Sequence, residues 1–426
     1  MPSLELITYV WMTASVLWGA MVLWWVRKGL TLSAPGEPPT KRQKVFSDNL
    51  QILWVLVVIS GVGVTSVTFS DDVIRYAWDG WVTIHGGDPY AYLPNAPELE
   101  HLRVTDGGLT LPDQVPYADL KTVYPPGAQM VFAAMAWMVG TDVQAWPLAW
   151  LLFFGLFALP AVMWRSNDLH TLVWFGLLFL SPTFLLFGLG EVHLDILVGL
   201  SILGGFLAAR RNHYVAAGVI LGLGITIKFL PVVALVYLAL QPDSNSSQRR
   251  QQFTQLLIPA LLLVALAYLP WLGSDLLGNL PNFAAVWRAN AGLFEIVRLV
   301  LPSDPARWLM LGMGLATAAF IWMRWRKQPA VATALTLLAF LLFSPVVHAW
   351  YLLPAALLLP LAPLRSTLVW LATMSVYGLW VVAYQTTGVW TETPALLAVE
   401  YVPVWIAFVL DLKNGPLDQR FKLKMV

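Results

Sequence analysis

The sequence predicts an all-α protein that crosses a membrane many times. Hydrophobic residues make up 58% of the 426 residues and charged residues only 12%. The apolar residues form runs of about 18 residues, the length that crosses a bilayer core as a helix. A transmembrane barrel requires short alternating strands, which the sequence does not show. We therefore expect a single transmembrane domain over residues 1–426.

The composition also bounds the partners. A formal net charge of +1 offers no basic face, so nucleic acid is not an expected partner. The absence of cysteine excludes disulfides and thiolate chemistry. Several of the 22 tryptophans stand at the ends of apolar runs, as residues that anchor helices at a membrane interface do.

The first two apolar runs set the predicted orientation. Residues 7–26 follow no basic stretch and carry no small-residue cleavage site, so we interpret them as a retained helix. Lysine and arginine follow this run and precede the second, residues 51–69, which places residues 27–49 in the cytoplasm. The N-terminus then lies outside, as does the segment after Phe69.

Residues 70–144 are predicted to form a long extracytoplasmic loop. As far as Tyr124 the loop carries glycine and proline turn signals and no strong helical period. Residues 127–140 are apolar but too short to span comfortably, and Tyr124 and two prolines precede them as at a helix start. We expect an interfacial or re-entrant helix there.

The later apolar runs alternate so that each basic cluster faces the cytoplasm. After the first two, the predicted crossings are residues 145–164, 171–187, 194–209, 214–227, 229–240, 253–271, 308–323, 330–346, 350–364, 367–384 and 396–410. This gives about thirteen helices, a second extracytoplasmic loop at 272–306 and a cytoplasmic tail at 412–426. The expected location is the inner (cytoplasmic) membrane, with the N-terminus outside and the C-terminus inside.

Polar residues that interrupt the apolar runs gather at the outer boundary. Ionisable groups there cost several kcal/mol unless they are paired or hydrated, so they mark candidate functional sites. The candidates are Asp71, Asp72, Arg75, Asp79, Tyr124, Glu191, His193, Asp195, Lys228, His348, Trp350 and Tyr351.

Each candidate also has a structural interpretation. Asp71 and Asp72 can cap a helix, and Arg75, one turn on, can form a helical ion pair. The acidic residues and histidine of the motif at 191–195 can be a hydrated turn or metal ligands. Lys228 can reach the interface or meet an anion, and His348 can be a structural histidine.

Together the candidates suggest chemistry on a lipid-linked substrate. A lone lysine at a helix break suits a phosphate. A nearby carboxylate suits a general base that deprotonates an acceptor hydroxyl. A lipid tail would lie along the apolar helices.

Six motifs occur in an order that matches a known family. They are DVIRYAWDG at 72–80, GDPY at 87–90, YPPGAQ at 124–129, EVHLD at 191–195, KFLP at 228–231 and SPVVHAWYLLP at 344–354. On these motifs the chain resembles the membrane glycosyltransferases of the GT-C fold. It most closely resembles their polyprenyl-phosphate-mannose-dependent bacterial mannosyltransferases.

The resemblance implies an inverting sugar transfer. Asp72, or its neighbour Asp71, would be the base, and Lys228 with Arg75 or His348 would hold the donor phosphate. The sugar or acceptor would be bound by Glu191, His193, Asp195, Tyr76, Asp79, Tyr124, Trp350 and Tyr351. The expected partners are a polyprenyl-phosphate sugar donor, a glycan or glycolipid acceptor and membrane lipids. No cofactor is expected; some GT-C enzymes use a divalent metal, and the sequence assigns no ligand to one.

Two features depart from the family pattern. The Asp loop follows the second predicted helix rather than the first, so residues 7–26 look like an added helix of unknown purpose. The long soluble C-terminal domain of some relatives is absent, which favours a lipid-linked or small glycan acceptor. Two other hypotheses remain: a flippase of a lipid-linked saccharide, which would show inverted repeats, and a lipid-binding subunit without turnover.

Overall fold

The computed structural model describes residues 3–27, 69–153, 169–241 and 246–417. Within these ranges the regular elements are helices and one short hairpin, joined by turns and irregular chain. The principal helices are α1 (Leu4–Arg27), α3 (Asp72–Ile84), α4 (Pro126–Val139), α5 (Ala145–Trp150), α7 (Leu169–Phe179), α8 (Pro182–Phe184), α9 (Asp195–Ala209), α10 (Tyr214–Ile227), α11 (Pro231–Ala239), α12 (Ser246–Tyr268), α13 (Leu280–Val286), α14 (Gly292–Arg298), α15 (Ser303–Trp325), α16 (Pro329–Leu342), α17 (Leu353–Ala356), α18 (Arg365–Thr373), α19 (Tyr377–Thr387) and α20 (Pro394–Asn414).

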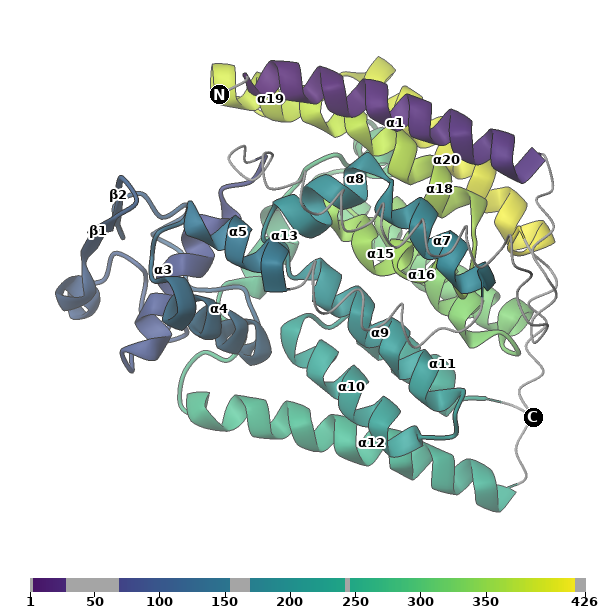
Figure 1. Cartoon of the computed structure of the whole chain (residues 1–426), viewed down its shortest axis with the longest axis horizontal. Helices are drawn as coiled ribbons and strands as arrows, with labels where there is room; N and C mark the ends of the chain where they lie inside the picture. Colours follow the sequence, from purple (N-terminus) through teal and green to yellow (C-terminus); the bar gives the residue numbers. More distant parts are fainter. Residues whose placement is uncertain (1–2, 28–68, 154–168, 242–245, 418–426) are drawn as a thin grey trace.

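The helices form a bundle from which one compact lobe projects. Figure 1 shows α9 to α12 along its lower side and α1, α18, α19 and α20 along its upper side. Helices α3 and α4 lie at the left end, beside the antiparallel hairpin of β1 (Val104–Asp106) and β2 (Leu109–Leu111). Helix α10 packs against both α9 and α12, and α3 packs against α4. The projecting lobe therefore belongs to the predicted loop at 70–144.

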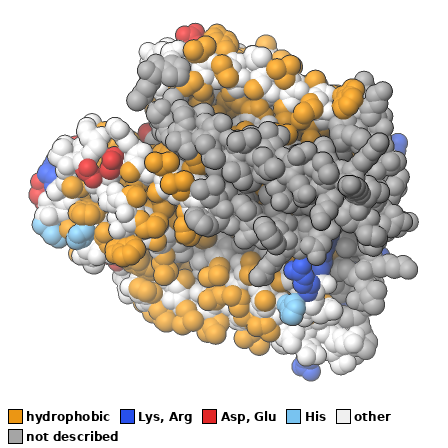
Figure 2. Space-filling model, viewed as in Figure 1, with side chains coloured by type: hydrophobic (Ala, Val, Ile, Leu, Met, Phe, Trp, Pro, Cys, Tyr) orange, Lys and Arg blue, Asp and Glu red, His pale blue; other side chains and the backbone are white. Residues whose placement is uncertain are grey.

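Several helices can cross a membrane. In the described ranges, five pass by length and composition: Leu4–Trp24, Ser247–Trp271, Ser303–Trp325, Arg365–Thr387 and Pro394–Asn414. A sixth arises if the pair Val173–Phe179 and Pro182–Gly190, bent by 68°, is one span. On α12 the outward side chains include Ile258, Leu261 and Leu262, all more than half exposed. Such an apolar outer face suits lipid rather than water, and Figure 2 shows it as a hydrophobic lower edge.

The predicted crossings fare unequally. Helices α1, α9, α10, α15 and α20 fall where the hydropathy predicted them. The second predicted crossing, 51–69, and the end of the third, 145–164, lie outside the described residues. The number thirteen therefore stays a prediction, while the all-α, multi-pass class is confirmed by the described helices.

The prediction of a continuous helix over residues 350–364 is wrong. The structure has a 3₁₀ turn, Ala349–Leu352, then the single turn α17 and irregular chain. Pro354, Pro360 and Pro363 explain the difference, because proline removes a backbone donor and clashes with the preceding turn. The segment is buried against α9 and α16, where irregular backbone at membrane depth is tolerated.

Two predicted loops also contain more helix than expected. Residues 72–84 form α3, although no strong helical period was expected there; Val73, Tyr76, Ala77 and Gly80 bury one face of it. The second long loop, 272–306, holds α13 and α14, and α15 begins at Ser303. The connection between the predicted crossings 229–240 and 253–271 is also shorter than expected, because α12 starts at Ser246.

Helix α4 confirms the short helix predicted at 127–140. Pro126 occupies its first turn, where the missing N–H costs nothing. A Cβ atom added to Gly80 of α3 would lie 2.3 Å from the carbonyl oxygen of Phe132 on α4. The backbone of α4 therefore occupies the space that a side chain at position 80 would need. This close packing fixes α3, whose first residue is Asp72.

Candidate active site

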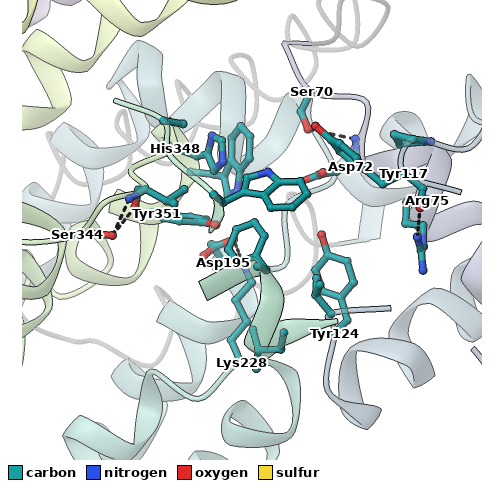
Figure 3. Close-up of a pocket in the computed structure, with 18 of the residues that line it drawn as sticks. Ser70, Asp72, Arg75, Tyr117, Tyr124, Asp195, Lys228, Ser344, His348 and Tyr351 are labelled. Carbon is teal, nitrogen blue, oxygen red and sulfur yellow. Dashed lines mark hydrogen bonds and ion pairs between the residues drawn. The ribbon is translucent and has the colours of Figure 1, made fainter. Parts of the chain in front are cut away.

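A cavity of about 970 Å³ opens where the projecting lobe meets the bundle. Figure 3 shows Asp72, Tyr124, Asp195, Lys228, Tyr351 and His348 around it. The predicted residues that line it are Asp71, Asp72, Arg75, Tyr124, Asp195, Lys228, His348, Trp350 and Tyr351. The other predicted residues, Tyr76, Asp79, Glu191 and His193, are not among its lining residues. The structure thus brings residues of five of the six motifs to one cavity, while the four residues just named do not line it.

The two aspartates stand at the start of α3. Asp71 is the N-cap residue, but its side chain makes no capping hydrogen bond. The backbone N–H of Asp72 donates to Ser70 Oγ (3.2 Å), and Asp72 Oδ2 accepts from the hydroxyl of Tyr76 (3.2 Å). The capping interpretation therefore holds for the position of these residues and not for their carboxylates. The Asp72 side chain stays 32% exposed, toward the cavity.

The surroundings of Asp72 favour its protonated form. Burial, and next the negative charge of Asp71, raise the pKa of Asp72 to about 6, against the opposing charge of Lys228. Burial also raises the pKa of Asp71. A carboxylate with a pKa near 6 remains ionised at neutral pH and is a stronger base than an ordinary aspartate.

A chain of hydroxyl groups orients Asp72. Tyr124 donates to the hydroxyl of Tyr76 (3.3 Å), which donates to Asp72. Tyr76 is fixed in turn by stacking on Phe132 of α4, with ring centroids 4.3 Å apart. Tyr76 and Tyr124 thus support the carboxylate from one side.

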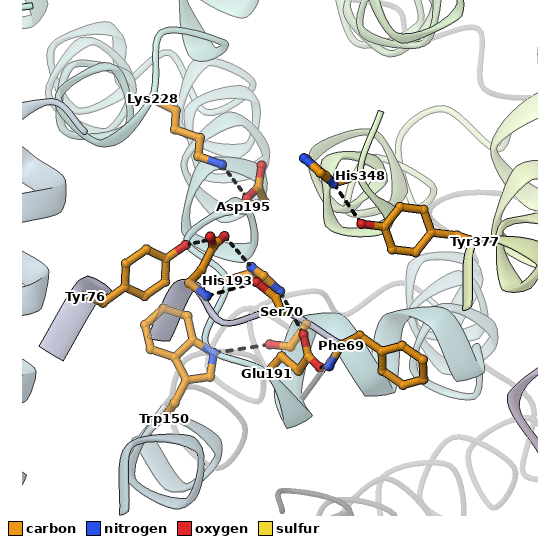
Figure 4. A network of polar contacts seen from close by, with 12 residues as sticks. Phe69, Ser70, Tyr76, Trp150, Glu191, His193, Asp195, Lys228, His348 and Tyr377 are labelled. Carbon is orange, nitrogen blue, oxygen red and sulfur yellow. Dashed lines mark hydrogen bonds and ion pairs between the residues drawn. The ribbon is translucent and has the colours of Figure 1, made fainter. Parts of the chain in front are cut away.

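Glu191 and His193 lie on the other side of Asp72. His193 Nε2 is 3.0 Å from Glu191 Oε2, and the N–H of Phe69 donates to Glu191 Oε1. His193 Nδ1 lies 4.0 Å from Asp72 Oδ2 and has no hydrogen-bond partner among the residues described. Figure 4 shows Glu191 and His193 beside each other. A hydrogen bond from Nδ1 to Asp72 would need a shorter distance and the tautomer that carries the proton on Nδ1.

A stack of three rings joins His193 to the last motif. The Trp350 ring stacks on the His193 ring, with centroids 3.9 Å apart, and on the His348 ring, with centroids 4.6 Å apart. His348 Nδ1 is 2.8 Å from the hydroxyl of Tyr377. Tyr377 was not predicted, because a tyrosine in an apolar helix gives no signal that separates it from core.

Lys228 follows directly on the last turn of α10. Its backbone is extended, and Pro231 starts α11 three residues later, so the lysine lies at a break between two helices. Its Nζ is 2.6 Å from Asp195 Oδ2 and 5.1 Å from the centre of the Tyr351 ring. The other oxygen, Asp195 Oδ1, is buried without a hydrogen-bond partner in the described chain. Lys228 therefore faces the cavity as one member of an ion pair.

Arg75 has a different environment from Lys228. Its Nε donates to Asp79 Oδ1 (2.9 Å), the ion pair one helical turn on. Its Nη1 donates to the carbonyl oxygens of Tyr117 (3.3 Å) and Leu120 (2.9 Å). Asp79 is buried and also accepts from Gln129 (3.3 Å). Arg75 thus ties the 117–120 turn to α3.

If residues 191–195 bound a metal ion, at least three of the ligating side chains would have to converge on one point. Within the described ranges, no three His, Asp or Glu side chains converge in a metal-binding arrangement. The histidine and carboxylates of this motif are instead directed to one another, to Asp72 and to Lys228.

Sequence reasoning missed part of the lining. Aromatic residues from both long loops, from α19 and from the segment after it line the cavity: Tyr117, Trp287, Tyr377, Tyr384 and Trp390. With 22 tryptophans and 13 tyrosines in the chain, no pattern distinguishes these from interfacial or core residues. Only their convergence identifies them.

Comparison with known proteins gives one family. The model of glycosyltransferase family 87 matches residues 122–347, somewhat more than half of the chain. Searches of curated proteins and of solved structures found no match. The matched stretch holds Tyr124, the motif at 191–195 and Lys228, while Asp71, Asp72 and α1 precede it. The chain therefore belongs to glycosyltransferase family 87, of the GT-C type, and is a membrane glycosyltransferase.

Proposed function

We propose that the protein moves a sugar, with mannose as the first candidate, from a polyprenyl-phosphate donor to a hydroxyl of a glycan or lipid-linked acceptor. The transfer inverts the anomeric carbon and takes place on the extracytoplasmic side. One observation carries this proposal: a single cavity holds an exposed carboxylate of raised pKa, a lysine and an apolar wall.

In this proposal Asp72 is the general base. It takes the proton of the acceptor hydroxyl as that oxygen attacks the anomeric carbon and the donor phosphate leaves with the bonding electrons. Its position at a helix start, held by Tyr76, presents one oxygen to the cavity. His193 Nδ1 lies 4.0 Å from Asp72 Oδ2, without a hydrogen bond between them.

Lys228 stabilises the leaving phosphate. Charge developing on a leaving group is best stabilised by a preorganised cation in a site that excludes water. Lys228 is 21% exposed and keeps Asp195 as a partner, so the phosphate would share the ammonium group with that carboxylate. His348 adds a ring nitrogen at the same cavity. Arg75 contributes less, since its Nε and Nη1 already hold Asp79 and two carbonyls.

The polyprenyl tail would occupy the apolar wall. Val233 and Phe340 line the cavity together with Phe229 and Val232 of the 229–233 segment. Phe229 and Val232 are 43% and 40% exposed, so the wall offers accessible apolar surface. Such a surface suits the chain of a lipid donor.

The test uses purified protein in nanodiscs with polyprenyl-phosphate-linked mannose and membrane lipid extract. Acceptor-dependent release of polyprenyl phosphate should fall by at least a hundredfold in Asp72→Asn, because a general base commonly contributes 10²–10⁴-fold. Asp113→Asn, an exposed aspartate of the same loop, is the matched control and should keep full activity.

The outcomes separate the hypotheses. Full activity in the Asp71→Asn, Asp72→Asn double variant removes the base assignment. Turnover only with another lipid-linked sugar corrects the donor. Donor binding or flipping without turnover with any acceptor supports the transporter or subunit hypothesis instead.

A further inference from the structure

Two loops far apart in the sequence supply an aromatic pair that lines the cavity. Tyr117 comes from the first long loop and Trp287 from the second, and both line the cavity. Their ring centroids are 5.1 Å apart at 72°. Tyr117 remains 54% exposed although it is a large aromatic residue.

The backbone of Tyr117 is unusual. Its φ is +55°, in the left-handed region that bulky residues rarely adopt. Residues held in such a conformation cluster at functional sites, because the surrounding structure must hold them there. Here the holding group is Arg75, whose guanidinium donates to the carbonyl of Tyr117 and is anchored on Asp79.

A guanidinium also holds Trp287 from behind. Arg307 Nη2 donates to the carbonyl oxygen of Trp287 (2.9 Å), and its Nη1 donates to that of Ala284 (2.9 Å). The ring of Trp287 further contacts Phe283, with centroids 5.3 Å apart. Both aromatic residues are therefore fixed through their backbones, while their rings remain at the cavity.

The pair lies close to the proposed base. Figure 3 shows Tyr117 next to Asp72. Burial, and next the charge of Asp71, raise the pKa of the Tyr117 phenol, with smaller contributions from Tyr384 and Asp72. A molecule resting on the pair would present its next group to the carboxylates.

We propose that Tyr117 and Trp287 bind a pyranose ring of the acceptor, so that the acceptor is a glycan with a sugar unit adjacent to the one that reacts. The axial C–H face of a pyranose packs on an aromatic ring, and its hydroxyls point outward to polar groups. Gln385 and Arg288 line the same cavity and supply those polar partners, although Arg288 is also paired with Glu295 (3.2 Å). A lipid chain has no hydroxyls that could bind to these polar groups.

This inference rests on the proposed function for the identity of the acceptor, but its test does not depend on turnover. Replacing Tyr117 by Asn removes the ring while keeping a residue that tolerates positive φ, so the loop stays folded. Trp287→Ala tests the same subsite from the other loop. Tyr92→Ala is the control, an exposed tyrosine of the first long loop that does not line the cavity.

With active protein, each of the two variants should raise the KM for the acceptor about tenfold, the effect of losing one aromatic contact. The kcat and the KM for the donor should stay within about twofold, as should every constant of the control. Tyr117→Phe should restore the acceptor KM, since the ring and not the hydroxyl does the packing. A purely structural defect would instead lower kcat and raise the KM for the donor as well.

The second measurement is saturation-transfer NMR with methyl mannobioside on Asp72→Asn protein in nanodiscs. Signal from the sugar protons that is lost on adding Tyr117→Asn or Trp287→Ala supports the subsite, whether or not transfer has been observed. Sugar binding that is absent, or unchanged in both variants, overturns it. A raised donor KM with an unchanged acceptor KM also overturns it, because the pair would then hold the donor.

Discussion

The raised pKa of Asp72 predicts how the rate depends on pH. If ionised Asp72 is the base, the rate follows the fraction of Asp72 that is deprotonated. With a pKa of about 6, the rate at pH 5 should be about a tenth of that at neutral pH. An ordinary aspartate, with a pKa of 3.8, would leave more than about nine tenths of the rate at pH 5.

Asp71 provides an internal test of this explanation. Its negative charge raises the pKa of Asp72, so Asp71→Asn should lower that pKa and move the acid limb of the profile to lower pH. Because Asp71 is exposed, the displacement should shrink as salt is added. If Asp71 were the base instead, the same substitution would abolish transfer.

The assay measures initial rates of polyprenyl phosphate release between about pH 4.5 and 8, with saturating donor, in nanodiscs. Thermal unfolding at each pH verifies that the protein remains folded. A rate that stays flat down to pH 5 refutes the assignment of a raised pKa to the base. An acid limb that Asp71→Asn leaves in place refutes the electrostatic part of the reasoning.

Three further substitutions test how the site is held. Trp11→Ala should lower the free energy of unfolding by about 3–5 kcal/mol, because Trp11 packs on Phe69 and Phe187 behind the site; exposed Trp24→Ala should change it little. Gly80→Ala should cost about 1–3 kcal/mol and reduce transfer by displacing α3, whereas Gly312→Ala, with open space around it, should be neutral. Lys228→Met should cost about 3–5 kcal/mol, since it leaves a buried carboxylate unpaired. Denaturant or thermal unfolding in detergent measures all three changes in stability. Equal effects in the Trp11 or Gly80 variant and its control would contradict the packing argument, and unchanged stability in Lys228→Met would contradict the ion-pair argument.

The role of α1 illustrates what contacts add to sequence. Hydropathy predicted the helix and left its purpose open. In the structure Trp11 donates to Thr183 Oγ1 (3.1 Å) and touches Phe69 and Phe187, and Phe187 in turn touches His193 and Trp350. The added helix thus packs against the wall of the site, a relation between residues far apart in the chain that no local pattern encodes.

Sequence by itself determined the class of the protein and most of its candidate residues. Long apolar runs are unfavourable in water and favourable in a bilayer, where only a helix or a closed barrel satisfies the backbone. Hydropathy alone therefore predicts membrane helices. A charge amid such runs is costly, so Lys228 and His348 were identifiable as isolated polar residues and Asp72 as part of an acidic cluster.

Tertiary structure decided the rest, because partnership depends on distance in space. Arg75 and Lys228 are both cations in the motifs, yet Arg75 is held by Asp79 and two carbonyls while Lys228 faces the cavity beside Asp195. Hydropathy predicted a helix over the proline-rich residues 350–364, but the structure has buried turns there. Hydropathy reports burial and not backbone geometry, which the prolines change. The aromatic pair of Tyr117 and Trp287 exists only where two loops meet.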